Sequence, residues 1–152
     1  MMALDFLGRG LKFPFGFHRL SGGARVSAAT SSDHEHIHES ILQILGTRPG
    51  ERFMRPDFGS RLKDLVFEPN DEVLKGLIRH HVIDALKRWE KRITVTGVTF
   101  DDSSENKDRN LLLVRISYRV IQTNVDGNLV FPFLREPSSP VSPRQIQAVA
   151  GK

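Results

Sequence analysis

The stretch LKRWEKRITVTGVTF, residues 86–100, contains a change of hydrophobic period from that of a helix to that of a strand. Before it, apolar residues recur at helical spacing on one face: Val73, Leu74, Leu77, Ile78, Val82, Ala85, Leu86 and Trp89. After it, Ile93 and Val95 alternate, and the phase slips by one at Gly97 before the alternation resumes. We therefore predict a long helix capped at Asn70, followed by a strand with a β-bulge.

The segment that follows this strand is typical of an antiparallel sheet. Apolar residues alternate over residues 112–120, which is the clearest strand pattern in the chain. The pair Asp126-Gly127 predicts a two-residue hairpin turn, and a last strand follows over residues 129–133. Pro132 cannot donate to a ladder, so we expect this last strand either to end there or to lie at an edge.

The first half of the chain predicts one more helix, over residues 33–45. Ser32 and Glu35 have the spacing of a capping box, and Gly46 ends the pattern. The expected apolar stripe is Ile37, Ile41, Ile44 and Leu45. The predicted fold is therefore α+β, with two main helices packed on a mainly antiparallel sheet that has exposed edge strands.

Three regions are expected along the chain. Residues 1–30 are rich in glycine and aromatics, and the alternation of Phe13, Phe15 and Phe17 suggests an extended arm or edge strand. Residues 31–134 are predicted to form the core domain. Residues 135–152 are rich in proline and serine, so we expect a flexible tail.

The composition excludes several classes of function. The 152 residues contain no cysteine, which rules out disulfides, thiolate metal sites and cysteine nucleophiles. A formal net charge of +4 is a weak basic excess, so we expect no nucleic-acid partner. No apolar stretch is long enough to span a membrane, and the first ten residues lack the pattern of a signal peptide, so we expect a soluble cytoplasmic protein without membrane insertion.

Catalytic and metal-binding patterns are weak. His34, His36 and His38 do not share one helix face, so we predict no metal site and no cofactor. Glu51, Asp57, Glu68 and Glu90 are the acids that lie near apolar or aromatic residues, but nothing singles out the pair that glycoside hydrolysis needs. We therefore predict no catalytic residues. The sequence also lacks a P-loop and a nucleophile elbow.

Two segments remain as candidates for function. The loop between the two helices contains Glu51 and Arg52, and its large apolar residues Phe53, Met54 and Phe58 lead us to expect an ordered, packed connection. Trp89, Glu90 and Arg92 lie where the helix gives way to the bulged strand. The charges there are either ordinary surface residues or an anchor for another chain, and composition alone does not decide between them.

Six pieces of the sequence occur in an order that resembles a known family. They are Gly10-Leu11-Lys12-Phe13-Pro14-Phe15, Ser40-Ile41-Leu42-Gln43-Ile44-Leu45, Thr47-Arg48-Pro49-Gly50-Glu51-Arg52, Pro56-Asp57-Phe58-Gly59-Ser60, Ala85 to Ile93, and Thr123-Asn124 with Asn128 to Phe133. Together they resemble the lysozyme-like baseplate wedge family of contractile tails. This family includes phage baseplate subunits and the matching subunits of type VI secretion and contractile injection systems.

The resemblance implies a structural role without enzymatic activity. Family members sit in the inner baseplate of a sixfold particle, bind the wedge core and offer a sheet on which the first sheath ring assembles. Spike, hub or tube proteins are further partners that the resemblance implies. The chain would then be made in the cytoplasm and incorporated into a phage-tail-like particle.

The resemblance also assigns roles to particular residues. The Glu-Pro-Arg motif of the family falls on Glu90-Lys91-Arg92, so Glu90 and Arg92, with Trp89, are expected to contact the wedge core. Lys91 stands where the family usually has proline. Strand addition by the sheath is expected along Leu129, Val130, Phe131 and Phe133.

Two other functions remain open from the sequence. A peptidoglycan-degrading enzyme would need two acids converging in a cleft at glycosidase separation. A small adaptor protein on the same fold would lack free strand edges.

Overall fold

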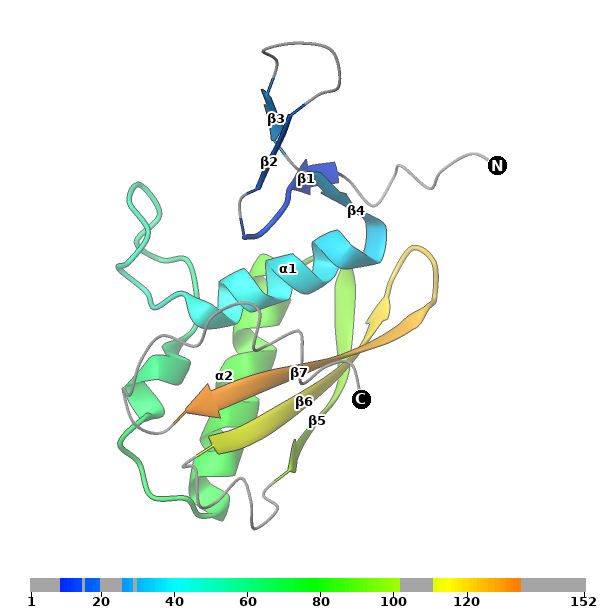
Figure 1. Ribbon diagram of the computed structural model, residues 1–152. Coiled ribbons are helices and arrows are strands. Elements are labelled where there is room, and N and C mark those ends of the chain that lie inside the picture. The colour runs from blue at the N-terminus through cyan, green and yellow to red at the C-terminus, as the bar shows by residue number, and fades with distance from the viewer. Residues whose placement is uncertain (1–8, 15, 20–25, 29, 102–110, 135–152) are drawn as a thin grey trace. The chain divides into compact units, whose positions relative to one another are not determined.

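The computed structural model describes residues 9–14, 16–19, 26–28, 30–101 and 111–134 (Figure 1). The chain divides into two compact units, residues 1–41 and 42–152, and the boundary falls within the first helix. The three regions predicted from the sequence stay a prediction, because residues 135–152 and much of the N-terminal arm lie outside the described residues.

The first unit contains two small antiparallel sheets and the start of a helix. Strand β1 (Arg9–Leu11) pairs with β4 (Thr30–Ser32), and β2 (Phe17–Arg19) pairs with β3 (Val26–Ala28). The predicted edge strand does not run through Phe13, which lies between β1 and β2, whereas Phe17 belongs to β2 and Phe15 lies outside the described residues. The ring nitrogen of Pro14, next to Phe13, has no hydrogen to donate to a ladder.

Helix α1 (Asp33–Gly46) follows β4 directly. The predicted stripe is confirmed, since Ile37, Ile41, Ile44 and Leu45 are all buried.

The second unit contains a short 3-10 helix and the long helix of the domain. Helix η2 (Arg61–Leu65) begins after Ser60, and α2 (Glu72–Trp89) begins after Asp71, whose carboxylate accepts from Leu74 N at 2.8 Å. The predicted cap at Asn70 is therefore displaced by one residue. The buried face of α2 is also narrower than predicted, and it consists of Leu74, Ile78, Val82, Ala85 and Leu86.

Val73 and Leu77 were predicted on that buried face, but they are 67% and 39% exposed. One turn of helix advances each residue by about 100°, so a helix that packs on one layer covers only a stripe. Val73 and Leu77 lie beside the stripe rather than within it.

The sheet of the second unit has the order β5-β6-β7 and is antiparallel throughout. Its strands are β5 (Ile93–Asp101), β6 (Leu111–Val120) and β7 (Asp126–Leu134). The register of β5 against β6 shifts between Val95 and Gly97, which confirms the predicted bulge. Helix α2 runs across one face of this sheet and contacts β5 (Figure 1).

The core of the second unit lies where the buried face of α2 meets the inner face of the sheet. Alternate residues of β6 point into it: Leu112, Val114, Ile116, Tyr118 and Val120. The α+β fold class is confirmed.

The turn between β6 and β7 differs from the prediction. Asp126 and Gly127 already belong to β7, where they pair with Arg119 and Tyr118. The chain turns earlier, where Asn124 takes the left-handed conformation with φ 54° and donates to Val120 O at 2.8 Å. Gly127 is needed for a different reason, because a Cβ there would lie 2.6 Å from the ring of Tyr118.

Candidate partner-binding site

The junction between α2 and β5 consists of three residues held at both ends. Glu90 N donates to Leu86 O at 2.9 Å, which closes the last turn of the helix. Ile121 N donates to Arg92 O at 2.9 Å, which ties the junction to the end of β6. The backbone of the junction is therefore fixed by both the helix and the sheet.

Glu90 and Arg92 form a two-pronged ion pair within this junction. Glu90 Oε1 accepts from Arg92 Nε at 2.7 Å, and Oε2 accepts from Nη2 at 2.6 Å. The Glu90 side chain is only 4% exposed, whereas that of Arg92 is 25% exposed. The hydrogen bonds from Arg92 to Glu90 raise the pKa of Arg92. The buried carboxylate thus fixes the orientation of a guanidinium that reaches the surface.

Tyr118 is a further member of this region that the sequence did not single out. It is 1% exposed and lies opposite Val95 on the inner face of the sheet. Burial, and then the negative charge of Glu90, raises the pKa of Tyr118 to about 12. The sequence predicted Tyr118 only as a strand residue, because no local pattern links it to a carboxylate 28 positions earlier.

The raised pKa of Tyr118 predicts how stability changes at high pH. The folded pKa lies above the unfolded value of about 10, so this contribution is complete below pH 10 and is lost as pH rises toward 12. We expect a loss of about 2–3 kcal/mol from this group. Tyr118 is the only tyrosine, so tyrosinate absorbance reports its ionisation directly. In Tyr118→Phe, the free energy of unfolding should fall less between pH 10 and pH 12 than in the wild type. An equal fall in both proteins would contradict the assignment.

The ring of Trp89 contacts one aromatic side chain and two arginines. Its ring centroid is 5.1 Å from that of Phe58, and the guanidinium groups of Arg55 and Arg88 lie 5.1 and 5.0 Å from the Trp89 ring. Arg52 covers Phe58 at 4.5 Å. The structure therefore brings together two of the predicted loop residues, Arg52 and Phe58, with Trp89.

Glu51, the third predicted loop residue, points elsewhere. It pairs with Lys63 on η2 at 2.9 Å and accepts from Arg48 N at 2.8 Å. The backbone hydrogen bond from Arg48, followed by that from Lys63, lowers the pKa of Glu51. Its role in the structure is to hold the loop.

The prediction that Phe53 and Met54 are packed is wrong. Phe53 is 91% exposed and Met54 is 81% exposed, although the loop around them is ordered. The order comes from backbone hydrogen bonds inside the loop, such as that from Gly50 N to Pro56 O at 2.8 Å. The backbone conformation of the loop therefore does not depend on burial of Phe53 and Met54 at its tip.

Strand β7 carries the residues predicted to meet the sheath. Leu129 and Phe133 are buried, and Phe131 shares their face of the strand, whereas Val130 lies on the opposite face. Within the described residues β7 is an outer strand of its sheet. What β7 can offer a partner is therefore mainly its outward-facing backbone, since three of the four predicted side chains face the core.

The histidines of α1 do not form a metal centre in the described part of the chain, where no three His, Cys, Asp or Glu side chains are close enough to hold an ion. His36 instead lies 3.3 Å from Ser31 Oγ, which donates to the buried carboxylate of Glu39. No helix among the described residues is long and apolar enough to cross a bilayer.

Comparison with known proteins identifies the family of the chain. The family described as "Baseplate wedge protein gp25" matches residues 31–125, which include α1, the loop, α2 and the Glu90–Arg92 junction. The chain belongs to this baseplate wedge family. Its members are structural subunits of contractile-tail baseplates.

Individual relatives support the assignment. The wedge subunit is 38% identical over 81 residues to baseplate protein W of Escherichia phage P2, an alignment that covers 53% of this chain and 70% of the relative. Among solved structures, it is 46% identical to the "putative tail lysozyme" of Geobacter sulfurreducens, with a TM-score of 0.63. That alignment covers 71% of this chain and 96% of the Geobacter chain. A chain of the anti-feeding prophage baseplate shares the fold, with 21% identity and a TM-score of 0.57. That alignment covers 87% of this chain and 89% of the prophage chain.

Sequence reasoning found Phe58 but missed the two arginines, Arg55 and Arg88, that lie over Trp89 in the wedge subunit, and the carboxylate that links them. Asp57 accepts from Arg88 at 3.4 Å and lies 3.7 Å from Arg55. Asp57 and Arg88 are 31 positions apart, and no periodicity joins a loop to the end of a helix. The run of arginines at 48, 52 and 55 was the one signal that could have drawn attention to this cluster.

Proposed function

We propose that this wedge subunit is a non-enzymatic connector that joins the wedge core to the first sheath ring and templates sheath assembly by strand addition. The observation that carries the proposal is the outer edge of β7, which no strand of the described residues pairs with. An unpaired edge is a template for another chain's strand.

The position of Pro132 indicates which residues of β7 face this edge. Pro132 lies in register with Leu113 although it has no N–H, so its nitrogen side must face away from β6. Backbone groups alternate in direction along a strand, and the register from Asp126 to Leu134 is regular. The outward N–H groups of β7 are therefore those of Asn128, Val130 and Leu134. The carbonyl oxygens of an added strand would accept hydrogen bonds from them.

The wedge core would bind on the opposite side of the sheet, at the helix–strand junction that leads into the other outer strand, β5. Arg92 is held by a buried carboxylate, so little conformational entropy is lost when its exposed edge binds a partner. Trp89, half-buried under arginines, adds a large apolar surface beside it. Lys91 in place of proline leaves the junction dependent on its hydrogen bonds for rigidity.

The state of the candidate acids supports a role without catalysis. A glycosidase acid needs a raised pKa, whereas the pKa of Glu51 is lowered and its carboxylate is paired with Lys63. Asp57 lies among arginines, and Glu90 is held by Arg92. Turnover of peptidoglycan by the purified chain would overturn the proposal and return attention to Glu51, Asp57 and Glu68.

The partners that follow are wedge-core and sheath proteins of a sixfold baseplate, with spike, hub or tube proteins nearby. We propose that the subunit is made in the cytoplasm and incorporated there into a phage-tail-like or injection particle.

Val130→Pro is the sharpest test of strand addition. The substitution removes an outward N–H without removing a hydrogen bond to β6, so the subunit should fold but lose the sheath. We expect tagged Val130→Pro, purified from the producing host and analysed by mass spectrometry, to recover wedge-core proteins normally and sheath protein at about one tenth of the wild-type amount or less.

Val130→Thr is the matched control, because threonine keeps both the N–H and the branched shape. It should recover sheath protein as the wild type does. Normal recovery of sheath by Val130→Pro would refute strand addition at this edge, and recovery of neither partner by the folded wild type would refute the connector role.

A further inference from the structure

The loop of residues 47–60, here called the arginine loop, is a pre-organised element. Gly50 N donates to Pro56 O at 2.8 Å and Ser60 N donates to Thr47 O at 2.9 Å, so hydrogen bonds close the loop near its tip and at its base. Arg55 and Phe58 also donate to carbonyls three residues earlier. The backbone thus has a defined path without a partner.

Ion pairs anchor the arginine loop to η2. Lys63 contacts Glu51 at 2.9 Å, and Arg48 contacts Asp64 at 2.6 Å. Each of these side chains is between 39% and 56% exposed, so the pairs contribute orientation more than stability. Two anchors on one short helix restrict rotation of the loop about its base.

The tip of the arginine loop presents two apolar side chains to solvent. Phe53 is 91% exposed and Met54 is 81% exposed. Met54 also has φ 67°, a left-handed conformation that costs a non-glycine residue about 1–2 kcal/mol. Exposed apolar surface and backbone strain coincide at one point, and neither stabilises the isolated subunit.

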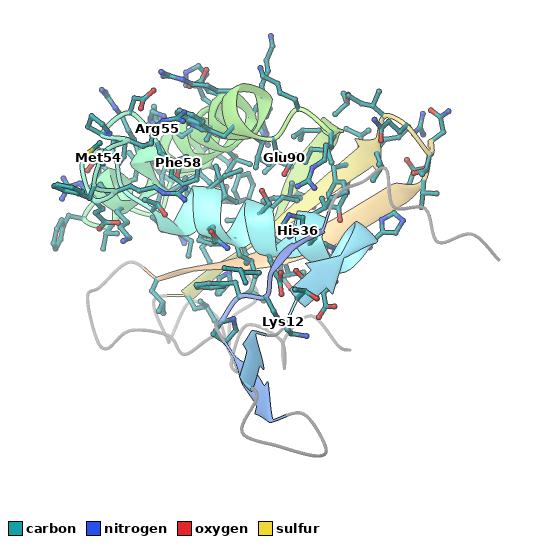
Figure 2. The ribbon with its side chains drawn as sticks, turned by 90° about the horizontal axis from the view of Figure 1, so that it is seen from above. Lys12, His36, Met54, Arg55, Phe58 and Glu90 are labelled. Carbon is teal, nitrogen blue, oxygen red and sulfur yellow. The ribbon has the colours of Figure 1, made fainter. Side chains whose placement is uncertain are left out.

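Cationic side chains surround this tip. Arg52 and Arg55 lie over the faces of Phe58 and Trp89, an arrangement that leaves guanidinium edges available to carboxylates. Figure 2 shows Met54, Arg55 and Phe58 gathered on one side of the molecule, apart from Glu90. Asp57 is already engaged with Arg55 and Arg88, whereas Arg52 makes no ion pair among the residues that the structure describes.

We propose that the arginine loop is a second docking surface, which inserts Phe53 and Met54 into an apolar pocket rimmed by carboxylates on another baseplate protein. Arg52 would pair with the carboxylates of that rim. Phe58, which packs on Trp89, would hold the Arg52 guanidinium in place through its ring. The inference rests on the proposed connector function and adds a contact beyond the Glu90–Arg92 pair and the β7 edge, next to the junction because the loop packs on Trp89.

The chemistry of the tip favours a protein partner over a nucleic acid. Met54 has no planar face on which a base could stack. Two adjacent apolar side chains on a rigid loop, with arginine beside them, are instead typical of an interface anchor.

The first test places a photo-crosslinking phenylalanine analogue at position 53 of the tagged full-length subunit in its producing host. Incorporation into particles is measured separately, by blotting the purified particles for the tag. We expect incorporation with a cross-link to a peptide of another particle protein that is rich in Asp or Glu and contains apolar residues.

The second test compares variants of the same tagged subunit. Phe53→Ser with Met54→Ser, and separately Arg52→Glu, should each reduce that cross-linked partner in co-purification by about tenfold or more. Phe67→Ser is the control, because Phe67 is an equally exposed aromatic, at 83%, on another segment. It should leave recovery unchanged.

The outcomes separate this inference from the proposed function. If the subunit enters particles but position 53 does not cross-link, cross-links to nucleic acid, or can be replaced without loss of the partner, the docking surface is refuted and the connector function stands. If the subunit is absent from particles, the connector function is refuted and the docking surface with it.

Discussion

Glu90→Ala is expected to lower the free energy of unfolding by about 2–4 kcal/mol, because it leaves a partly buried guanidinium without its carboxylate. The carboxylate accepts two hydrogen bonds from the Arg92 side chain and one from Arg92 N at 3.2 Å, and it is 4% exposed. Loss of these bonds should also free the junction between α2 and β5. Chemical denaturation followed by circular dichroism measures the change.

The double variant Glu90→Ala with Arg92→Ala separates stability from assembly. Removing both charges removes the unpaired guanidinium, so the double variant should be more stable than Glu90→Ala alone. It should nevertheless abolish incorporation into wedges, because the fixed guanidinium is absent. A folded double variant that is incorporated normally would contradict the proposed contact with the wedge core.

Asp126→Ala is the matched control for the buried pair. Asp126 also holds an arginine with two hydrogen bonds, to Arg119 Nε at 2.7 Å and Nη2 at 3.2 Å, but both side chains are more than half exposed. Solvent screens such a pair, so its loss should change stability little. Equal destabilisation by Asp126→Ala and Glu90→Ala would show that burial of Glu90 is not what makes its pair strong.

Gly59→Ala is expected to destabilise the second unit by about 2–4 kcal/mol, because the backbone there suits only glycine. Gly59 has φ +115°, and a Cβ would lie 2.2 Å from Thr47 O. That oxygen accepts the hydrogen bond from Ser60 N that closes the arginine loop. The substitution should therefore loosen the loop and weaken the partner contact proposed for its tip.

Gly76→Ala provides the opposite case within the same unit. Gly76 lies inside α2 with open space around it, so alanine should stabilise the helix by about 0.5–1 kcal/mol. Thermal unfolding of the two variants beside the wild type measures both effects. A Gly59→Ala protein as stable as the wild type would mean that the path of the loop does not depend on this close approach.

Much of the fold could be predicted from local patterns. Helical spacing located both helices, and alternation located β5 and β6, because burial of one face imposes a period that a single segment already contains. The phase slip at Gly97 predicted the bulge that the register confirms. Errors occurred where two local solutions compete, as in the turn, where Asn124 rather than Asp126-Gly127 takes the left-handed conformation.

For the candidate site, too, some features could be predicted from the sequence and others could not. The sequence named the junction residues by resemblance, and their contact with a partner stays a prediction. It also placed the last strand at an edge through Pro132, which the strand order of the described residues confirms. The effect of the buried Glu90 carboxylate on Tyr118 and the placement of Arg55 over Trp89 were not predicted, because they join residues 28 and 34 positions apart. The packing predicted for Phe53 and Met54 was wrong because apolar character alone does not show whether a loop is closed by side chains or by its own hydrogen bonds.

The sequence by itself determined the two main helices, the strands of the main sheet and the bulge, since each depends on residues close together in the chain, and six short pieces in order identified the wedge family. Only the tertiary structure decided which charges are buried and which apolar residues remain exposed. Burial and exposure depend on which distant segments come together, and a local pattern carries no information about that.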